Sequence, residues 1–230
     1  MRARKLAYAH SGWDHELVAA RRTGLREQKK QATREGLRAA ALRLALECGP
    51  ENVRVDDIAA AAGVSPRTYN NYFSSREQAI VAAVTAEREA QIAAAVAARP
   101  ASVRLADAVA DAIVDQYTNP GQHNPAALLL ITTRPALRDA FVDTAGTIEH
   151  PLAAAIAERL GDTDPYTAHV LAASVAAAVR VALRRWVQPT AGGLVVPTGP
   201  LPELLRAALA PLAPALDAAE QQAQQRSPAR

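Results

Sequence analysis

The sequence predicts an all-α protein with a helix-turn-helix near its N-terminus. Half of the 230 residues are hydrophobic, but only 4% are aromatic, and alanine runs recur along the chain. Small alanine side chains favour closely packed helices. No stretch shows the sustained period-two alternation of β-branched and aromatic residues that is typical of strands. The third observation is a pair of short helical patterns around a glycine turn at residues 55–73. A chain of this length can bury a substantial core in one or two domains.

The helix-turn-helix prediction rests on the sequence VDDIAAAAGVSPRTYNNYF at residues 55–73. A first helix is expected over Asp56–Ala61. Gly63 then tolerates the left-handed backbone of a sharp corner. Ser65 is a good N-cap, and the proline after it suits the first helical position. These signals predict a second helix over Pro66–Phe73.

The second helix has an apolar side and a polar side. Tyr69 and Phe73 are spaced i, i+4 and are expected to face inward. The residues left on the outer side are Arg67, Thr68, Asn70, Asn71 and Tyr72. Arginine can pair with guanine, asparagine with adenine, and hydroxyl groups with bases or phosphates, so this face suits the major groove of DNA. The alternative is an ordinary helical hairpin with a solvated face.

The surrounding residues, from Lys30 to Val84, resemble the N-terminal DNA-binding domain of TetR-type transcriptional regulators. The resemblance is carried by the alanine-rich helix ending at Gly49, Val55–Ala59, Ala62–Ser65, Thr68, Tyr72–Phe73 and Ser75–Glu77. Asn70 and Asn71 stand where the family often has an aromatic residue and a histidine or large residue. Arg54 stands where it commonly has threonine. The resemblance does not extend into the C-terminal part of the chain.

The resemblance implies a ligand-responsive regulator that binds double-stranded operator DNA. Base contacts are expected from the second helix, which begins at Pro66 and carries Arg67, Thr68, Asn70 and Asn71. Phosphate contacts are expected from Arg54, Tyr72 and Arg76, and from Arg26, Lys29 and Lys30 at the start of the first helix. Two function classes compete with this interpretation: an architectural DNA-binding protein without an effector, and an all-α enzyme with a DNA-binding head.

Charge supports a DNA-binding head on a body that does not bind DNA. Residues 1–76 hold 14 Lys and Arg against 8 Asp and Glu, whereas residues 77–230 hold 12 against 15. The basic half is therefore the half with the helix-turn-helix, as expected for binding to phosphates.

The resemblance also predicts a homodimer through the last two long helices, here Tyr166–Trp186 and Pro202–Leu216. The first of these is rich in small residues, which let helices approach closely: Ala168, Ala172, Ala173, Ala176, Ala177 and Ala182. A dimer has a physical reason, because one recognition helix reads few bases and two symmetric heads read two half-sites. The alternative is that these helices pack only inside one subunit.

A small-molecule pocket is implied among the helices between about residues 84 and 160. The apolar candidates are Tyr117, Leu128, Leu129, Ile131, Phe141 and Ile148, and the polar candidates are Arg134, His123 and His150.

The chain is expected to divide into four parts. Residues 1–25 form a basic extension that is disordered, contains a short helix around Asp14–Arg22, or reaches the minor groove with Arg2, Arg4, Lys5, Arg21 and Arg22. Residues 26–80 form the head, 81–216 the body and 217–230 a disordered tail. The expected helices are Leu25–Glu47, Asp56–Ala61, Pro66–Phe73, Ser75–Ala98, Val103–Thr118, Pro125–Thr133, Pro135–Leu160 with kinks at Gly146 and Pro151, Pro165–Val187 and Pro202–Leu216.

Other functions find little support in the sequence. The five histidines are scattered, without metal-ligand spacing, and no phosphate loop or nucleophile elbow occurs, so we expect no enzyme activity, metal or cofactor. Cys48 is the only cysteine, which excludes an intramolecular disulfide and favours a packing role over a thiol sensor. No signal peptide or apolar run long enough for a membrane span is apparent, which predicts a soluble cytoplasmic protein.

Overall fold

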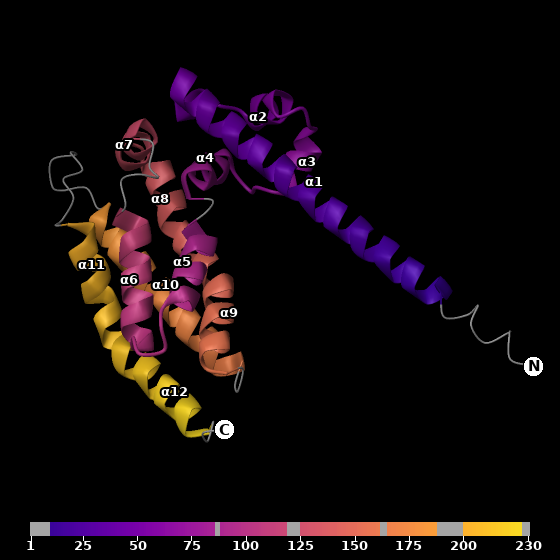
Figure 1. Cartoon of the computed structure of the whole chain (residues 1–230). Coiled ribbons are helices and arrows are strands. Elements are labelled where there is room, and N and C mark those ends of the chain that lie inside the picture. Colours follow the sequence, from indigo (N-terminus) through magenta and orange to yellow (C-terminus); the bar gives the residue numbers. More distant parts are fainter. Residues whose placement is uncertain (1–9, 86–87, 119–124, 162–164, 188–199, 227–230) are drawn as a thin grey trace, which may run out of the picture. The chain divides into compact units, whose positions relative to one another are not determined.

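The computed structural model describes residues 10–85, 88–118, 125–161, 165–187 and 200–226 (Figure 1). These residues form helices and no strand, so the all-α prediction is confirmed. The chain forms two compact units, the head up to Arg76 and the body from Glu77. The boundary lies four residues before the predicted one at residue 80, and it separates the basic part of the chain from the acidic part.

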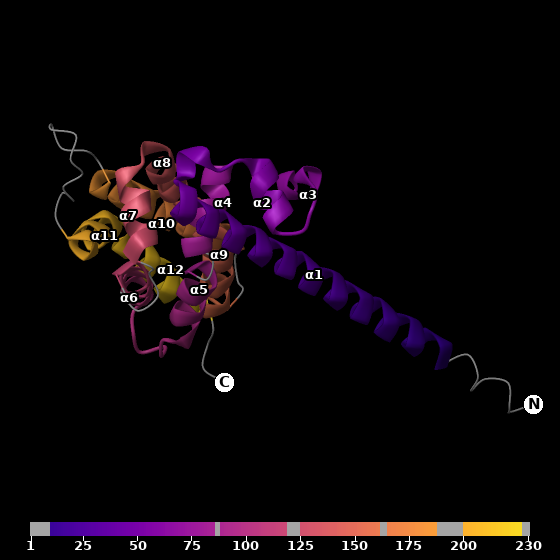
Figure 2. The ribbon, with the colours of Figure 1, turned by 90° about the horizontal axis from the view of Figure 1, so that it is seen from above.

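The first helix of the head, α1 (His10–Cys48), is much longer than expected. It begins at His10 rather than near Leu25, and it extends far beyond α2 and α3 (Figures 1 and 2). No proline interrupts this stretch, and its alanine, arginine, glutamate and leucine residues are good helix formers. Residues 10–25 are therefore helical rather than a disordered extension, and Arg21 and Arg22 belong to the helix. Arg2, Arg4 and Lys5 lie outside the described residues.

The C-terminal half of α1 supplies the core of the head. Its inward side chains Leu37, Ala41 and Ala45 are almost completely buried. Gly49, with a φ of 85°, ends the helix, and the short 3-10 helix η1 (Pro50–Asn52) follows. The chain then turns into α2 (Val55–Ala61), which packs against α1.

The corner between α2 and α3 (Pro66–Asn70) follows the predicted turn chemistry. Gly63 has a φ of 70°, and the backbone N–H of Thr68 donates to the Ser65 hydroxyl at 3.1 Å. α3 ends three residues earlier than predicted, because the chain passes into a turn at Asn71. Asparagine competes with helical hydrogen bonding, which explains the early end.

Two buried aromatic side chains support α3 from the interior of the head. Tyr69 and Phe73 are 0% and 2% exposed, and their ring centroids lie 5.8 Å apart. The Tyr69 hydroxyl donates to the Ser75 carbonyl at 2.8 Å. The inward orientation predicted for both aromatic residues is confirmed, and it fixes which face of α3 is left outside.

The single helix predicted over Ser75–Ala98 is described in two parts, α4 (Arg76–Thr85) and α5 (Arg88–Ala98). Residues 86 and 87, between them, lie outside the described residues. The predicted turn at residues 119–121 also lies outside.

The body contains seven further α-helices among its described residues, and most begin where a proline or a turn predicted a start. They are α6 (Leu105–Thr118), α7 (Pro125–Thr133), α8 (Pro135–Asp143), α9 (Glu149–Arg159), α10 (Pro165–Trp186), α11 (Leu201–Leu209) and α12 (Ala213–Arg226), with 3-10 turns η3 (Thr144–Ile148) and η4 (Ala210–Leu212). The expected kink near Gly146 is η3. α10 forms the centre, because it contacts α8, η3, α9, α11, η4 and α12.

Helix α12 corrects the prediction of a disordered tail. It continues to Arg226, and Glu220 is only 9% exposed. One Glu220 carboxylate oxygen accepts from the Leu105 backbone N–H at 2.8 Å, at the start of α6, and the other is paired with Arg159 at 3.0 Å. Arg159 also donates to the Arg99 and Val103 carbonyls. Partners that are distant in sequence therefore order a segment whose polar composition suggested disorder.

Helix α10 also corrects the prediction that no segment is long and apolar enough to span a membrane. The segment Tyr166–Trp186 is long and apolar enough to cross a membrane, with a mean hydropathy of 1.5. The sequence reading had found no such run. Because this helix packs against six other elements of the body, we interpret it as a core helix.

Candidate DNA-binding surface and body interior

The outer face of α3 presents a group of polar side chains to solvent. Arg67, Asn70 and Asn71 are exposed, as is Pro66 at the start of the helix. Tyr72 is half-buried. The buried ring of Tyr69 holds this short helix from behind, so the exposed side chains stand on a rigid support. Such a support is what precise recognition of base edges needs.

Thr68 differs from its exposed neighbours. It is half-buried, and its hydroxyl lies 2.9 Å from the hydroxyl of Ser65. The same Ser65 oxygen caps the helix by accepting from the Thr68 backbone N–H. Thr68 therefore takes part in the capping of α3, in addition to the base contact expected for it.

Arg76 has a structural role that the sequence did not reveal. Its Nη1 donates to the Val53 carbonyl at 2.8 Å and to the Glu51 carbonyl at 3.0 Å. These bonds tie the start of α4 to the segment before α2. The guanidinium therefore serves the fold of the head, and the phosphate contact expected of Arg76 stays a prediction beside this role.

The remaining candidate cations of the head lie on its surface. Arg54 is exposed at the N-cap position of α2, and Arg26, Lys29 and Lys30 are exposed along α1. The sequence reading missed Arg34, one turn after Lys30, whose guanidinium lies 5.9 Å from the Phe73 ring centroid. Arg34 therefore places a cation of α1 beside the Phe73 ring, close to the end of α3. Its i, i+4 spacing from Lys30 could have indicated it.

The alanines of α10 divide between two faces. Ala168, Ala172, Ala176 and Ala182 are buried within the subunit, at 2% exposure or less. Ala177 is exposed, on a face that also carries Tyr166, Val170 and Val181, exposed by 83%, 62% and 63%. The inner alanines thus follow the alternative of packing inside one subunit, and the outer face remains open to a partner.

The predicted ligand residues of the body are mostly interior. Tyr117, Ile131, Phe141 and Ile148 are 6% exposed or less, and Leu128 is half-buried. Leu129 is 63% exposed and faces away from the interior, because it lies on the outer side of α7. Arg134 and His150 lie on the surface, and His123 lies outside the described residues.

A buried cation joins two of these ligand candidates. Arg88, the first residue of α5, is 6% exposed. Its guanidinium carbon lies 4.2 Å from the Tyr117 ring centroid and 5.5 Å from that of Phe141. Burial lowers the pKa of Arg88 below its ordinary value. The sequence analysis did not single out this residue, because its burial depends on rings from two other helices.

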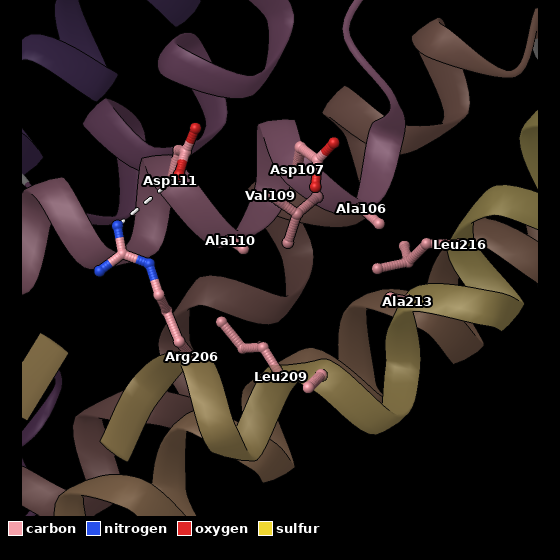
Figure 3. A pocket seen from close by; sticks show the side chains of 10 residues that line it. Ala106, Asp107, Val109, Ala110, Asp111, Arg206, Leu209, Ala213 and Leu216 are labelled. Carbon is pink, nitrogen blue, oxygen red and sulfur yellow. Dashed lines mark ion pairs between the residues drawn. The ribbon is translucent and has the colours of Figure 1, made fainter. Parts of the chain in front are cut away.

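A groove lies elsewhere on the body, between α6 and the α11–α12 segment (Figure 3). Its volume is about 280 Å³, and Ala110, Leu209 and Leu216 contribute apolar walls. Arg206 points toward Asp111 along one side, with their closest atoms 3.9 Å apart. None of the predicted ligand residues lines this groove. It is slightly smaller than the roughly 300–1,000 Å³ of typical small-molecule sites.

The described residues contain no group of three His, Cys, Asp or Glu side chains that could hold a metal ion. Cys48 is exposed, and its thiol lies 3.1 Å from the Leu44 carbonyl. The packing role expected for Cys48 therefore does not include burial in the core.

Comparison with known proteins matches both units of the chain. Residues 37–83 match the family described as "Bacterial regulatory proteins, tetR family", and residues 103–217 match the "MftR C-terminal domain". The HTH-type transcriptional regulator TcmR of Streptomyces glaucescens is 40% identical over 67 residues, which are 29% of this chain and 30% of that relative. The chain thus matches less than a third of that relative's length. The match over 103–217 extends the likeness into the body. The chain belongs to the TetR family of DNA-binding transcriptional regulators.

Proposed function

We propose that this regulator is a homodimeric, cytoplasmic repressor that a small molecule releases from a palindromic operator. The observation that carries the proposal is the exposed polar face of α3, which the buried side chains of Tyr69 and Phe73 support. The second unit of the chain has an interior of its own. The first feature suits sequence-specific DNA recognition, and the second suits a separate response to a ligand.

In this proposal the head reads bases with Arg67, Asn70 and Asn71 and uses its other cations for phosphates. Arginine and asparagine donate and accept in the patterns that guanine and adenine present in the major groove. Arg54, Lys29 and Lys30 are exposed where they can neutralise phosphates, and Tyr72 adds a hydroxyl. Thr68 helps to cap α3, and its methyl group can contact the methyl group of a thymine.

The exposed face of α10 supports dimerisation. Tyr166, Val170 and Val181 are large apolar side chains on one side of a long helix, with Ala177 between them. Contiguous apolar surface of this kind is typical of protein interfaces. A two-fold axis through this face would place two heads for two half-sites, and half-sites on one face of DNA lie about 34–36 Å apart or at multiples of that spacing.

Effector control follows from the same spacing requirement. A ligand that binds the body releases DNA only if it prefers a conformation with a different separation of the heads. The body is the larger unit, and it buries polar groups that a simple dimerisation module does not need. These features favour an effector over a purely architectural role.

Selection of bound fragments from genomic DNA by the purified protein tests the DNA-binding part. We expect a site with two symmetric half-sites. A reporter that carries this site across its promoter should then be repressed when the protein is present. Selection of an asymmetric or degenerate site would contradict the proposed dimeric recognition, and increased transcription would identify an activator.

Reciprocity tests the effector part. If a ligand lowers operator affinity by some factor, saturating operator must weaken ligand binding by the same factor. Calorimetric titration with and without operator measures both. A body ligand that binds equally well in both titrations is not the inducer. If no ligand that binds the body lowers operator affinity, an architectural DNA-binding protein would be favoured.

A further inference from the structure

The interior of the body contains a polar cluster centred on Arg88. The guanidinium lies over the face of the Tyr117 ring, from α6, and close to the Phe141 ring, from α8. Arg88 itself begins α5. Three helices therefore converge on one buried cation. Removing a charged group from water costs free energy, so a buried guanidinium indicates a structural or binding role.

The body also buries polar atoms that have no hydrogen-bond partner among the described residues. Tyr117 is 6% exposed, and its hydroxyl interacts with the Arg88 guanidinium but meets ordinary hydrogen-bond geometry with no described residue. Gln116 Oε1, on the same helix, and Arg180 Nε, on α10, are also buried without a partner there. Buried polar groups are nearly always satisfied in proteins, so such a cluster indicates a water molecule, an ion or a ligand group.

Arg180 contacts the segment that follows Phe141. Its Nη2 lies 3.0 Å from the position that a Cβ would take at Gly146 in η3. Gly146 thus leaves room for this second guanidinium on η3, the segment that follows the helix of Phe141.

The buried polar atoms of the body include atoms of two guanidinium groups, a phenol and the Gln116 amide. Burial raises the pKa of Tyr117, and the carboxylate of Glu89 is near enough to raise it further. Burial lowers the pKa of Arg88 and Tyr117 raises it; neither cause is a carboxylate, and a negative ligand group suits these buried cations.

The geometry of Arg88 suits a carboxylate. A guanidinium that stacks on an aromatic face directs its N–H groups outward in its own plane, where a carboxylate can accept two of them. Burial raises the pKa of the Tyr117 hydroxyl, so that group keeps its proton and can donate a third hydrogen bond. The rings of Tyr117 and Phe141 would meet the apolar part of the same molecule.

We propose that the effector is an organic anion whose carboxylate is bound by Arg88 and the Tyr117 hydroxyl, with its apolar part against Phe141. The proposal rests on the effector control proposed above and names the chemical class of the effector. It assigns to Arg88 a ligand-binding role.

Matched acid and amide pairs provide the test on the full-length protein. The probes are octanoate with octanamide and phenylacetate with phenylacetamide, with binding measured by calorimetry and by the rise in thermal midpoint. At least one acid should bind, and its amide should bind much more weakly. Equal binding of every acid and its amide, or binding of neither acid, would overturn the proposal.

Variants locate the anion. Arg88→Met should weaken acid binding by about 10–150-fold, which is typical of a lost hydrogen bond to a charged group, and should leave amide binding unchanged. Tyr117→Phe should weaken acid binding by about 2–10-fold. Arg88→Lys keeps the charge without the planar fork and should fall between. Should Arg88→Met fail to fold, the other two variants decide. The control Ala110→Phe fills the groove of Figure 3 and should change nothing.

Operator release separates this proposal from the proposed function. If an acid binds in the predicted way but does not release operator DNA, the anion site stands and effector control by that site fails. If a neutral or cationic molecule releases the operator and its binding ignores Arg88→Lys and Tyr117→Phe, effector control stands and the anion site is wrong.

Discussion

The head and the body differ in whether charged side chains enter the interior. In the head, the candidate functional residues of α3 are exposed, and the interior consists of alanine, aliphatic and aromatic side chains. In the body, Arg88 and Glu220 lie inside, and every described residue with a buried polar or charged side chain follows the division at Glu77. Many charges of the body also lie at its surface, such as Arg104 and Asp107, but among the described residues only the body also places charged side chains in its interior.

This difference teaches what each unit can recognise. Exposed cations remain hydrated until they meet a polyanion such as DNA, and their binding is then strongly dependent on salt. A buried cation interacts strongly in a medium of low polarity, but only with a group that reaches it. An outer surface suits a large partner, and an interior cluster suits a small one. The apolar outer face of α10 adds a third kind of surface, suited to another protein.

The largest expected effect concerns that face of α10. Ala177→Glu places a charge among Tyr166, Val170 and Val181 and should produce monomers. Loss of the second head should lower operator affinity by about 10²–10⁴-fold, because linked binding is worth that much. Light scattering and DNA titration measure both effects. Ala154→Glu, on the exposed side of α9, is the matched control. A wild-type protein that is monomeric at micromolar concentration would contradict the interface.

The second effect concerns the buried ion pair of the body. Arg159→Met leaves the Glu220 carboxylate buried without its partner, so the free energy of unfolding should fall by about 3–5 kcal/mol. Removal of residues 217–230 should destabilise the body similarly, since Glu220 also caps α6. Denaturant unfolding measures both. Arg43→Met, whose pair with Glu47 is exposed, is the control and should change little. A stable truncated protein would mean that α12 is dispensable.

The third effect separates two arginines of the head. Arg76→Ala removes two hydrogen bonds to carbonyls and should lower the thermal stability of the head, so that its DNA binding is lost as unfolding proceeds. Arg67→Ala should leave stability unchanged and reduce operator affinity by about 1–3 kcal/mol. Thermal unfolding and DNA titration distinguish them. Identical behaviour of the two variants would remove the distinction between support and recognition.

The smallest effect concerns the turn of the head. Gly63 has a φ of 70°, and a Cβ added there would meet no atom within 4 Å. Gly63→Ala should therefore be destabilising through backbone conformation alone, by about 1–2 kcal/mol. Gly36→Ala in α1 is the control, because that site is also open and helical, so alanine should stabilise it by up to about 1 kcal/mol. Calorimetry should show the opposite signs.

The head could be predicted in detail because its signals are local. The Ser65 cap, the Gly63 turn and the inward Tyr69 are encoded within a few residues of where they act. The structural role of Arg76 could not be predicted, because its carbonyl partners lie 23 and 25 residues away. The start of α1 was placed too late, since the family likeness begins only near Lys30.

The body could be predicted only as a series of helices. Prolines at 125, 135 and 165 mark true helix starts. The order of α12 and the burial of Arg88 depend on contacts that no local pattern contains. Glu220 finds its partners 61 and 115 residues away, and Arg88 meets rings from two other helices. The same reason explains why exposed Leu129 was grouped with buried residues.

The base preference of α3 variants tests most directly whether the exposed face of the head reads DNA. DNA selected by the wild-type protein is compared with DNA selected by Asn70→Ala and Asn71→Ala. We predict two symmetric half-sites for the wild type, and for at least one variant a loss of preference at the same position in both half-sites, with unfolding unchanged. If both variants select the same sites as the wild type with equal affinity, the exposed face of α3 does not read DNA.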